Sequence, residues 1–261
     1  MVVNVLSIAG SDPSGGAGVQ ADMKTFAALG VYGMAAITAL TVQNTQGVRS
    51  AHPVDADVVA AQVQAVLDDV RVDAVKIGML GDAAVIGAVA GVLRERRPPV
   101  VVLDPVLVAT SGDALLAGGA VPTLLAELLP LADVVTPNVP EAAALLGTDA
   151  ARDETEQTRQ ARALAALGPA VLLKGGHLGG EQSVDVLVEG DHTTRLAAPR
   201  IATTATHGTG CTLSSALAAL RPSHVDWENT ARAAKAYVSR ALAAGAGLDV
   251  GRGRGPLRHD V

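Results

Sequence analysis

The segment with the clearest chemical character is His207-Gly208-Thr209-Gly210-Cys211, which directly precedes a stretch with the apolar spacing of a helix. Gly208 and Gly210 leave backbone N–H groups accessible at a helix N-terminus, where the peptide dipoles favour a bound anion. Cys211 falls at the helix start, a position that lowers the pKa of a thiol. The segment is therefore a candidate anion site with a candidate reactive thiol. An inert, buried cysteine is the alternative, and for Cys211 taken alone it is the more common case.

Oxygen-bearing side chains follow two predicted strands. Asp104 comes directly after the run Val100–Leu103. Asn138 and Glu141 follow Asp133–Thr136 and begin a helix, where their spacing of three places them on one face. Carboxylate and amide oxygens suit Mg²⁺, which proteins hold largely through water and substrate phosphates. These residues are candidate metal and phosphate ligands, with a capping-box role as the alternative for Glu141.

A lysine and a glutamine also stand at strand ends. Lys174 closes the run Ala170–Leu173 and meets two glycines, so it either neutralises a phosphate or is a solvated charge. Gln43 follows another strand. Its amide can donate and accept hydrogen bonds at once, which suits the edge of an aminopyrimidine ring.

The turn after the first strand, from Gly10 to Gly18, contains four glycines. Glycine lets a ligand approach the backbone closely, although an ordinary strand-to-helix turn is an equally good interpretation. The sequence has no G-x-x-x-x-G-K-[ST], no G-x-S-x-G and no H-E-x-x-H, and no G-x-G-x-x-G follows the first strand. A P-loop NTPase is therefore excluded, a dinucleotide site is disfavoured, and the serine-hydrolase and zinc-protease motifs are absent.

The segments that must position these residues alternate between strand and helix patterns. The strands are predicted at Val2–Ala9, Ala35–Leu40, Val72–Ile77, Val100–Leu103, Asp133–Thr136 and Ala170–Leu173. The helices are predicted at Val19–Leu29, Asp57–Val70, Ala83–Arg96, Gly210–Leu220 and Asp226–Ala244. This alternation predicts an α/β fold with a mainly parallel sheet, and ligands bind beyond the carboxyl ends of such strands. Val184–Ile201 reads as a hairpin, which predicts an antiparallel edge. One domain over residues 1–261 is the simplest organisation.

The amino-acid composition argues against nucleic-acid and membrane partners. The hydrophobic content of 49% suits a sheet covered on both faces. A net charge of -6 with 2% aromatic residues argues against a nucleic-acid partner. One cysteine permits no intrachain disulfide, no signal-peptide pattern is present, and no apolar run reaches the ~18 residues that a bilayer span needs. We therefore expect a cytoplasmic protein with no membrane partner.

Taken together, these segments resemble the hydroxymethylpyrimidine/phosphomethylpyrimidine kinases of thiamine synthesis, within the ribokinase-like superfamily. The matching motifs occur in order along nearly the whole chain: Ile8–Gly18 with Gln20–Asp22, Gln43–Thr45, Lys76–Leu80, Leu103–Val106, Thr136–Asn138 with Glu141, Lys174–His177 and His207–Thr212. The resemblance implies a three-layer α/β/α fold and two successive ATP-dependent phosphorylations at one site. It also implies Mg²⁺ as a cofactor and a homodimer.

The resemblance further implies roles for individual residues. In the substrate pocket it places Gly10, Asp22, Gln43 and Met79, with Gln43 bonded to the pyrimidine ring. With the metal and the nucleotide phosphates it places Asp104, Asn138, Glu141 and Lys174. In the anion hole it places Gly208, Thr209 and Gly210. Cys211 takes the place where sugar kinases of the superfamily carry an aspartate base.

Cys211 therefore raises a mechanistic hypothesis. Positioning and charge stabilisation dominate phosphoryl transfer, so a strong base is not essential. A Cys211 thiolate is nevertheless the hypothetical acceptor of the hydroxyl proton, and near-full turnover by Cys211→Ala would contradict it. One position departs from the family: Thr110 stands where a lysine is common, so nucleotide affinity is in question and Lys174 is the substitute charge.

Three other functions compete with this interpretation. A vitamin B6 kinase on the same fold also phosphorylates a hydroxymethyl group on a ring, but Gln43 and Cys211 favour the pyrimidine. A sugar kinase is disfavoured, because no aspartate follows Gly210. A non-catalytic regulator is disfavoured by the intact acidic, lysine and anion-loop positions.

Overall fold

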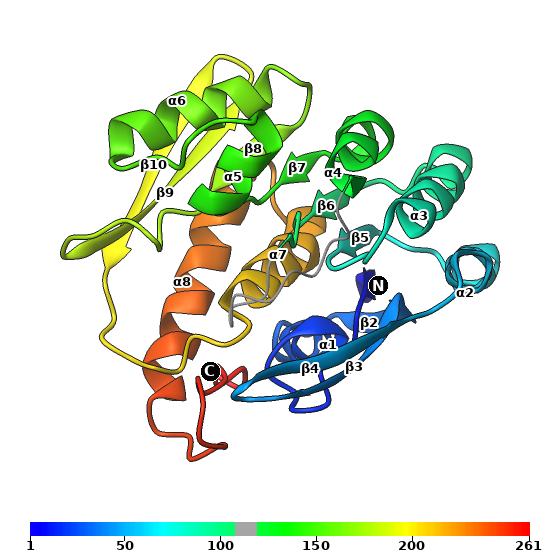
Figure 1. Cartoon of the computed structure of the whole chain (residues 1–261), viewed down its shortest axis with the longest axis horizontal. Helices are drawn as coiled ribbons and strands as arrows, with labels where there is room; N and C mark the ends of the chain where they lie inside the picture. Colours follow the sequence, from blue (N-terminus) through cyan, green and yellow to red (C-terminus); the bar gives the residue numbers. More distant parts are fainter. Residues whose placement is uncertain (108–118) are drawn as a thin grey trace.

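The computed structural model of the chain describes residues 1–107 and 119–261. Within these residues a central sheet has eight strands in the order β10-β9-β8-β7-β6-β5-β1-β2 (Figure 1). The strands are β1 (Asn4–Ala9), β2 (Tyr32–Ile37), β5 (Ala74–Ile77), β6 (Val101–Leu103), β7 (Val134–Val135), β8 (Ala170–Leu173), β9 (Gln182–Glu189) and β10 (His192–Pro199). Strands from β2 to β8 pair in parallel, whereas β9 and β10 pair antiparallel. The predicted mainly parallel sheet with an antiparallel edge is confirmed.

Helices cover both faces of this sheet. On one face lie α2 (Ala56–Asp69), α3 (Ala83–Arg96), α4 (Ala120–Thr123), a π-helical turn (Leu124–Leu128), a 3₁₀ turn (Leu129–Leu131), α5 (Val139–Leu146) and α6 (Glu154–Ala165). On the other face lie α1 (Gly18–Ala28), α7 (Thr209–Leu220) and α8 (Trp227–Gly245). The predicted three-layer α/β/α arrangement is confirmed. No helix in the described ranges is both long enough and apolar enough to cross a bilayer.

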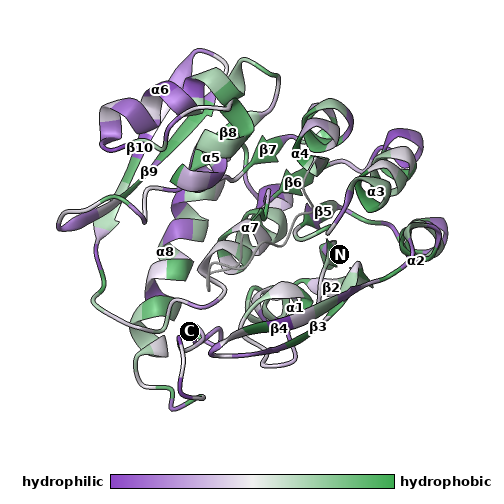
Figure 2. Ribbon diagram, viewed as in Figure 1, coloured by the Kyte–Doolittle hydropathy of each residue, from purple (hydrophilic) through white to green (hydrophobic). Residues whose placement is uncertain are grey.

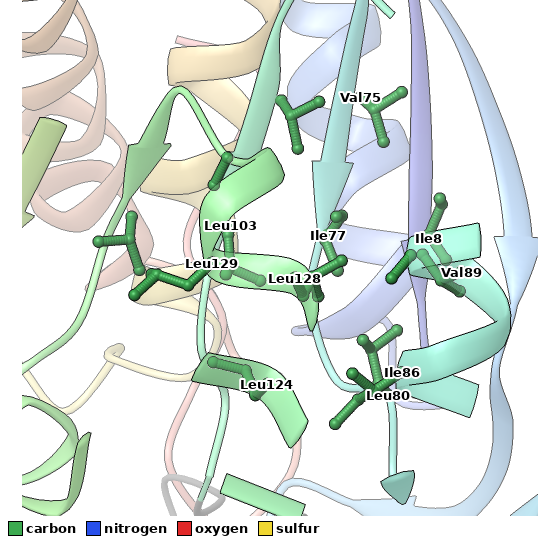
Figure 3. Close-up of a cluster of buried hydrophobic side chains, with 14 of the residues drawn as sticks. Ile8, Val75, Ile77, Leu80, Ile86, Val89, Leu103, Leu124, Leu128 and Leu129 are labelled. Atoms are coloured by element: carbon green, nitrogen blue, oxygen red, sulfur yellow. The ribbon is translucent and has the colours of Figure 1, made fainter. Parts of the chain in front are cut away.

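Two apolar clusters hold the layers together, because successive side chains of a strand point to opposite faces. Leu6 belongs to the cluster under α2, α3, α5 and α6, whereas its neighbour Val5 belongs to the cluster under α1, α7 and α8. Figure 3 shows Ile8, Ile77 and Leu103 of the sheet facing side chains from α3 and from the 124–131 region. Figure 2 shows β7 and β8 as hydrophobic and the outer side of α6 as hydrophilic.

Two further strands form a separate antiparallel sheet, β3 (Ala39–Asn44) with β4 (Gly47–Pro53). The predicted single strand over Ala35–Leu40 is wrong, since β2 ends and β3 begins inside it. Thr38 divides the two: its N–H donates to the carbonyl of Ala9 and its hydroxyl to the carbonyl of Met79. The β3–β4 ribbon matters for the site because Gln43 lies near its turn.

Candidate active site

The carboxyl ends of five neighbouring parallel strands meet at one edge of the sheet. The residues that follow β1, β5, β6, β7 and β8 there are Gly10, Met79, Asp104, Asn138 and Lys174. A cavity of about 680 Å³ opens at this edge, and it is also lined by Gln43, Glu141 and the segment Gly208–Cys211. All of the predicted site residues except Asp22 are therefore brought together around one space.

Lys174 is the charged centre of the cavity. Its Nζ lies 2.9 Å from Oδ1 of Asp104 and 3.8 Å from Oε2 of Glu141. The carboxylate of Asp104 is buried and also accepts hydrogen bonds from the hydroxyls of Thr136 (2.9 Å) and Ser214 (3.2 Å). Burial opposes ionisation of Asp104, but the charges of Lys174 and Lys76 outweigh it and hold its pKa below the usual range.

Glu141 occupies a different electrostatic position. Burial raises its pKa to about 7, with the charge of Asp104 adding to the rise and that of Lys174 opposing it. Its Oε2 accepts from the N–H of Asn138 at 2.7 Å, while Oδ1 of Asn138 accepts from the N–H of Glu141 at 2.9 Å. This is the capping box that the sequence offered as the alternative, and it is confirmed. It fixes both side chains at the N-terminus of α5, beside Lys174.

The segment His207–Cys211, which we call the anion loop, lies next to Lys174 and Asp104. Gly208 is the N-cap of α7 with φ of +81°, and a Cβ there would overlap the carbonyl of Gly16. A Cβ on Gly210 would stand 3.2 Å from Nζ of Lys174 and 3.6 Å from Oδ2 of Asp104. The first turn of a helix leaves N–H groups without helical acceptors. The loop thus presents backbone donors and a helix N-terminus next to Lys174.

Cys211 does not have the expected acidity. Burial raises the pKa of its thiol to about 11, and the opposing charge of Lys76 is offset in part by the carboxylates of Asp22 and Asp104. The prediction of a lowered pKa is wrong, because withdrawal from water and nearby negative charge outweigh the helix N-terminus. At neutral pH the side chain is a thiol.

Asp22 does not line the cavity, so the expectation drawn from the resemblance is corrected here. Its side chain is fully buried. Nζ of Lys76 lies 2.8 Å from its Oδ2, and the hydroxyls of Ser7 (2.6 Å) and Ser215 (2.7 Å) donate to the same carboxylate. These partners come from β1, β5 and α7, so the Asp22 carboxylate links three elements of the fold. Of this buried pair, Lys76 lines the cavity and Asp22 does not.

The other end of the cavity contains Gln43. Nε2 of His207 lies 2.7 Å from Oδ2 of Asp12 and 3.5 Å from Nε2 of Gln43. A ring nitrogen that donates its proton to a carboxylate has no lone pair left to accept, so the Gln43 amide remains available to a ligand. Burial opposes ionisation of Asp12, yet hydrogen bonds from His207 and Ser14 hold its pKa at about 2.

The sequence of the chain matches a known protein family. The family described as phosphomethylpyrimidine kinase matches residues 12–258. The chain belongs to this family. It is 54% identical to the hydroxymethylpyrimidine/phosphomethylpyrimidine kinase of Escherichia coli (strain K12) over 258 residues, which cover 98% of this chain and 97% of the relative.

Two solved structures of small-molecule kinases share this fold. An ADP complex of Bacillus subtilis pyridoxal kinase superposes with a TM-score of 0.91 at 36% identity, covering 99% of this chain and 98% of that one. The phosphomethylpyrimidine kinase of Clostridium difficile 630 superposes with a TM-score of 0.81 at 38% identity, covering 92% of this chain and 99% of that one.

Sequence reasoning missed the part of the cavity that α8 lines. Val238 and Leu242 of α8 line it together with Ile201. Lys235 of the same helix pairs with Asp185 at 2.6 Å, and Asp185 also accepts from the N–H of Gly175 at 3.0 Å. The amphipathic pattern of the helix gave no local sign that one stripe faces a ligand space. Thr110, the departure from the family pattern, lies outside the described residues.

Proposed function

We propose that this protein uses ATP to phosphorylate the hydroxymethyl group of 4-amino-5-hydroxymethyl-2-methylpyrimidine, and then phosphorylates the monophosphate to the diphosphate, in thiamine biosynthesis. The observation that carries the proposal is the position of Gly210, at the N-terminus of α7, where a Cβ would stand 3.2 Å from Nζ of Lys174 in the Lys174–Asp104 ion pair. The Lys174 ammonium group and the N-terminus of α7, with its backbone N–H donors and helix dipole, therefore lie close together in the cavity. Such preorganised positive potential stabilises the charge of a phosphoryl group in transfer.

Different residues of the chain orient the substrate, bind the transferred phosphoryl group and neutralise its charge. The uncommitted amide of Gln43 orients the aminopyrimidine ring through a donor and an acceptor at once. Gly208, Thr209 and Gly210 hold the transferred group at the start of α7, where the N–H of Thr209 already donates to the carbonyl of Thr206 at 3.3 Å, and Lys174 neutralises the group. Cys211 contributes a neutral thiol beside the anion loop rather than a thiolate base. Positioning supplies most of the catalysis, as is usual for phosphoryl transfer.

ATP supplies the phosphoryl group, and the cavity has room for it under α8. The apolar side chains of Ile201, Val238 and Leu242 suit the base of a nucleotide. The oxygen atoms of Asp104 and Glu141 fit Mg²⁺ only as ligands that act largely through water. Among the described residues no group of three His, Cys, Asp or Glu side chains could hold a metal, and both oxygens of Asp104 are engaged. Glu141 and Asp104 would therefore hold Mg²⁺ largely through water and nucleotide phosphates, which is the habit of this ion.

A vitamin B6 kinase is the second candidate, favoured by the close superposition on a pyridoxal kinase. The test is phosphorus NMR of two parallel reactions with ATP and Mg²⁺, one with the hydroxymethylpyrimidine and one with pyridoxine. We expect a monophosphate and then a diphosphate ester of the pyrimidine. Phosphorylation of pyridoxine alone, and only once, would move the assignment to vitamin B6.

Failure to phosphorylate either ring would contradict both kinase assignments and favour a binding protein. The homodimer expected from the family resemblance stays a prediction, which light scattering coupled to size-exclusion chromatography would test.

A further inference from the structure

Five lysine and arginine side chains of the described residues line the cavity, and four of them are already committed. The five are Lys76, Lys174, Arg200, Lys235 and Arg254. Each of the three lysines lies within 3 Å of a carboxylate: Asp22, Asp104 or Asp185. The guanidinium of Arg200 donates to backbone carbonyls, those of Gly176 and Gly180 among them.

Arg254 is different, because its guanidinium has neither a carboxylate nor a carbonyl partner among the described residues. The side chain is exposed at the edge of the cavity. Within the part of the chain that the structure describes, it is the one lining lysine or arginine whose charged group has no protein partner.

The backbone that carries Arg254 is nevertheless fixed on both sides. Its N–H donates to the carbonyl of Thr45 at 3.1 Å, and the N–H of Gly253 donates to the Thr45 hydroxyl at 3.2 Å. On the other side, the carbonyl of Gly255 accepts from the N–H of His207 at 3.0 Å. Figure 1 shows this C-terminal segment passing beside the β3–β4 ribbon after α8 ends. An exposed cationic side chain thus stands on a hydrogen-bonded backbone between the Gln43 ribbon and the anion loop.

The charge of Arg254 acts on the same region as that of Lys174. His177 lines the cavity from an exposed position, and its pKa is lowered first by partial desolvation and then by the charges of Lys174 and Arg254. Lys174 and Arg254 therefore line the same cavity and both act on His177.

The proposed function sets an unusual demand on this cavity. Its first substrate is a neutral alcohol, whereas its second carries a phosphate with a charge of about -1.5 to -2 near pH 7. A buried, unpaired cation would be costly while the neutral substrate is bound. An exposed guanidinium avoids that cost, because water solvates it until a phosphate arrives. Guanidinium also matches phosphate through paired N–H donors.

We propose that Arg254 binds the phosphate of the monophosphate substrate and so adapts one cavity to both phosphorylation steps. The inference rests on the proposed function. It assigns to the C-terminal segment a specificity role between the alcohol and its phosphate ester.

The test is a steady-state comparison of three proteins: wild type, Arg254→Gln and Arg252→Gln. Arg252 is a matched control, since it is an exposed arginine of the same glycine-rich segment but does not line the cavity. For each protein, KM is measured separately for the pyrimidine alcohol and for its monophosphate at saturating ATP. Calorimetric titration of the monophosphate without nucleotide gives the binding constant directly.

We expect Arg254→Gln to raise the ratio of the monophosphate KM to the alcohol KM by ~10-fold, as loss of a charged hydrogen bond predicts. Its dissociation constant for the monophosphate should rise by a similar factor, while Arg252→Gln leaves the ratio unchanged. An unchanged ratio in Arg254→Gln, or equal effects of both variants, would overturn the inference. If wild type phosphorylates neither compound, it is the proposed function that fails.

Discussion

Nε2 of His207 lies 2.7 Å from Oδ2 of Asp12, although 195 residues separate them in the sequence. The contact joins the glycine-rich turn after β1 to the anion loop before α7. The two backbones pack with no room for a side chain: a Cβ on Gly16 would overlap the His207 ring, and one on Gly208 would overlap the carbonyl of Gly16. The glycine-rich turn after β1 and the anion loop therefore form one tightly packed wall of the cavity.

This packing predicts that Gly208→Ala is damaging. The backbone at φ of +81° disfavours any side chain, and the new Cβ would also push Gly16 away. We expect the free energy of unfolding to fall by ~2 kcal/mol and kcat by at least ~10-fold. Urea denaturation and steady-state kinetics measure the two effects.

The control is Gly87→Ala in α3, where a Cβ meets no atom within 4 Å. It should stabilise the protein by ~0.5–1 kcal/mol through helix propensity and leave kcat unchanged. A Gly208→Ala protein as stable and as active as wild type would show that the two loops are not tightly packed.

Lys174 is predicted to act through its charge on the transferred group. Lys174→Gln removes that charge and leaves the buried Asp104 carboxylate without its ion-pair partner. We expect kcat to fall by ~100-fold, the size that loss of one preorganised transition-state contact commonly has. Steady-state kinetics with the pyrimidine alcohol would measure kcat, with circular dichroism confirming the fold. Lys174→Arg, which keeps the charge, should retain more activity than Lys174→Gln, and equal losses would argue against an electrostatic role.

The Cys211 thiol is predicted to react slowly at neutral pH. Its pKa of about 11 means that the thiolate fraction, and with it the rate of alkylation by iodoacetamide, rises ~10-fold per pH unit from pH 7 to pH 10. Cys211 is the sole cysteine, so the label reports on it alone. The urea-unfolded chain is the control, since its thiol should titrate near ~8.5. A plateau of the native rate below pH 8 would restore the thiolate hypothesis.

His259 is predicted to make stability depend on pH. Burial, with the charge of Lys24, lowers its pKa to about 4, below the unfolded value of 6.5. The unfolded chain then binds a proton first as pH falls. This contribution to stability is present above pH 6.5, decreases between pH 6.5 and 4, and is absent below pH 4.

Urea denaturation of wild type and His259→Asn at pH 7.5 and pH 5 measures this effect. Lowering the pH should cost wild type ~1–2 kcal/mol more than the variant. His52→Asn, at an exposed histidine of β4, should behave as wild type. Equal losses in wild type and His259→Asn would contradict the prediction.

Much of the candidate site could be predicted because strand ends carry it. Asp104 and Lys174 each follow a short run of buried apolar residues, and such runs mark parallel strands. Parallel strands share an edge at their carboxyl ends, so the order of motifs along the chain already implied that these side chains meet. The bounds of α3 and β8 were predicted to the residue, because the apolar pattern of each element lies within its own segment of the chain.

Other elements lacked a local pattern. The surface of α6 is strongly polar, and its inner side buries Gln157 and Gln160 rather than a full apolar stripe. The β2–β3 boundary rests on hydrogen bonds from Thr38 to Ala9 and Met79, which lie in other strands or loops. Periodicity cannot reveal either feature.

The sequence by itself determined the fold class, the family and the residues that gather at the sheet edge, because these follow from patterns between neighbours along the chain. The tertiary structure alone decided the state of those residues. The pKa of Cys211 depends on Asp22, Lys76 and Asp104, and the availability of Arg254 depends on its guanidinium having no carboxylate or carbonyl partner among the described residues. Burial and charge act through space, so they are set only when distant segments pack together.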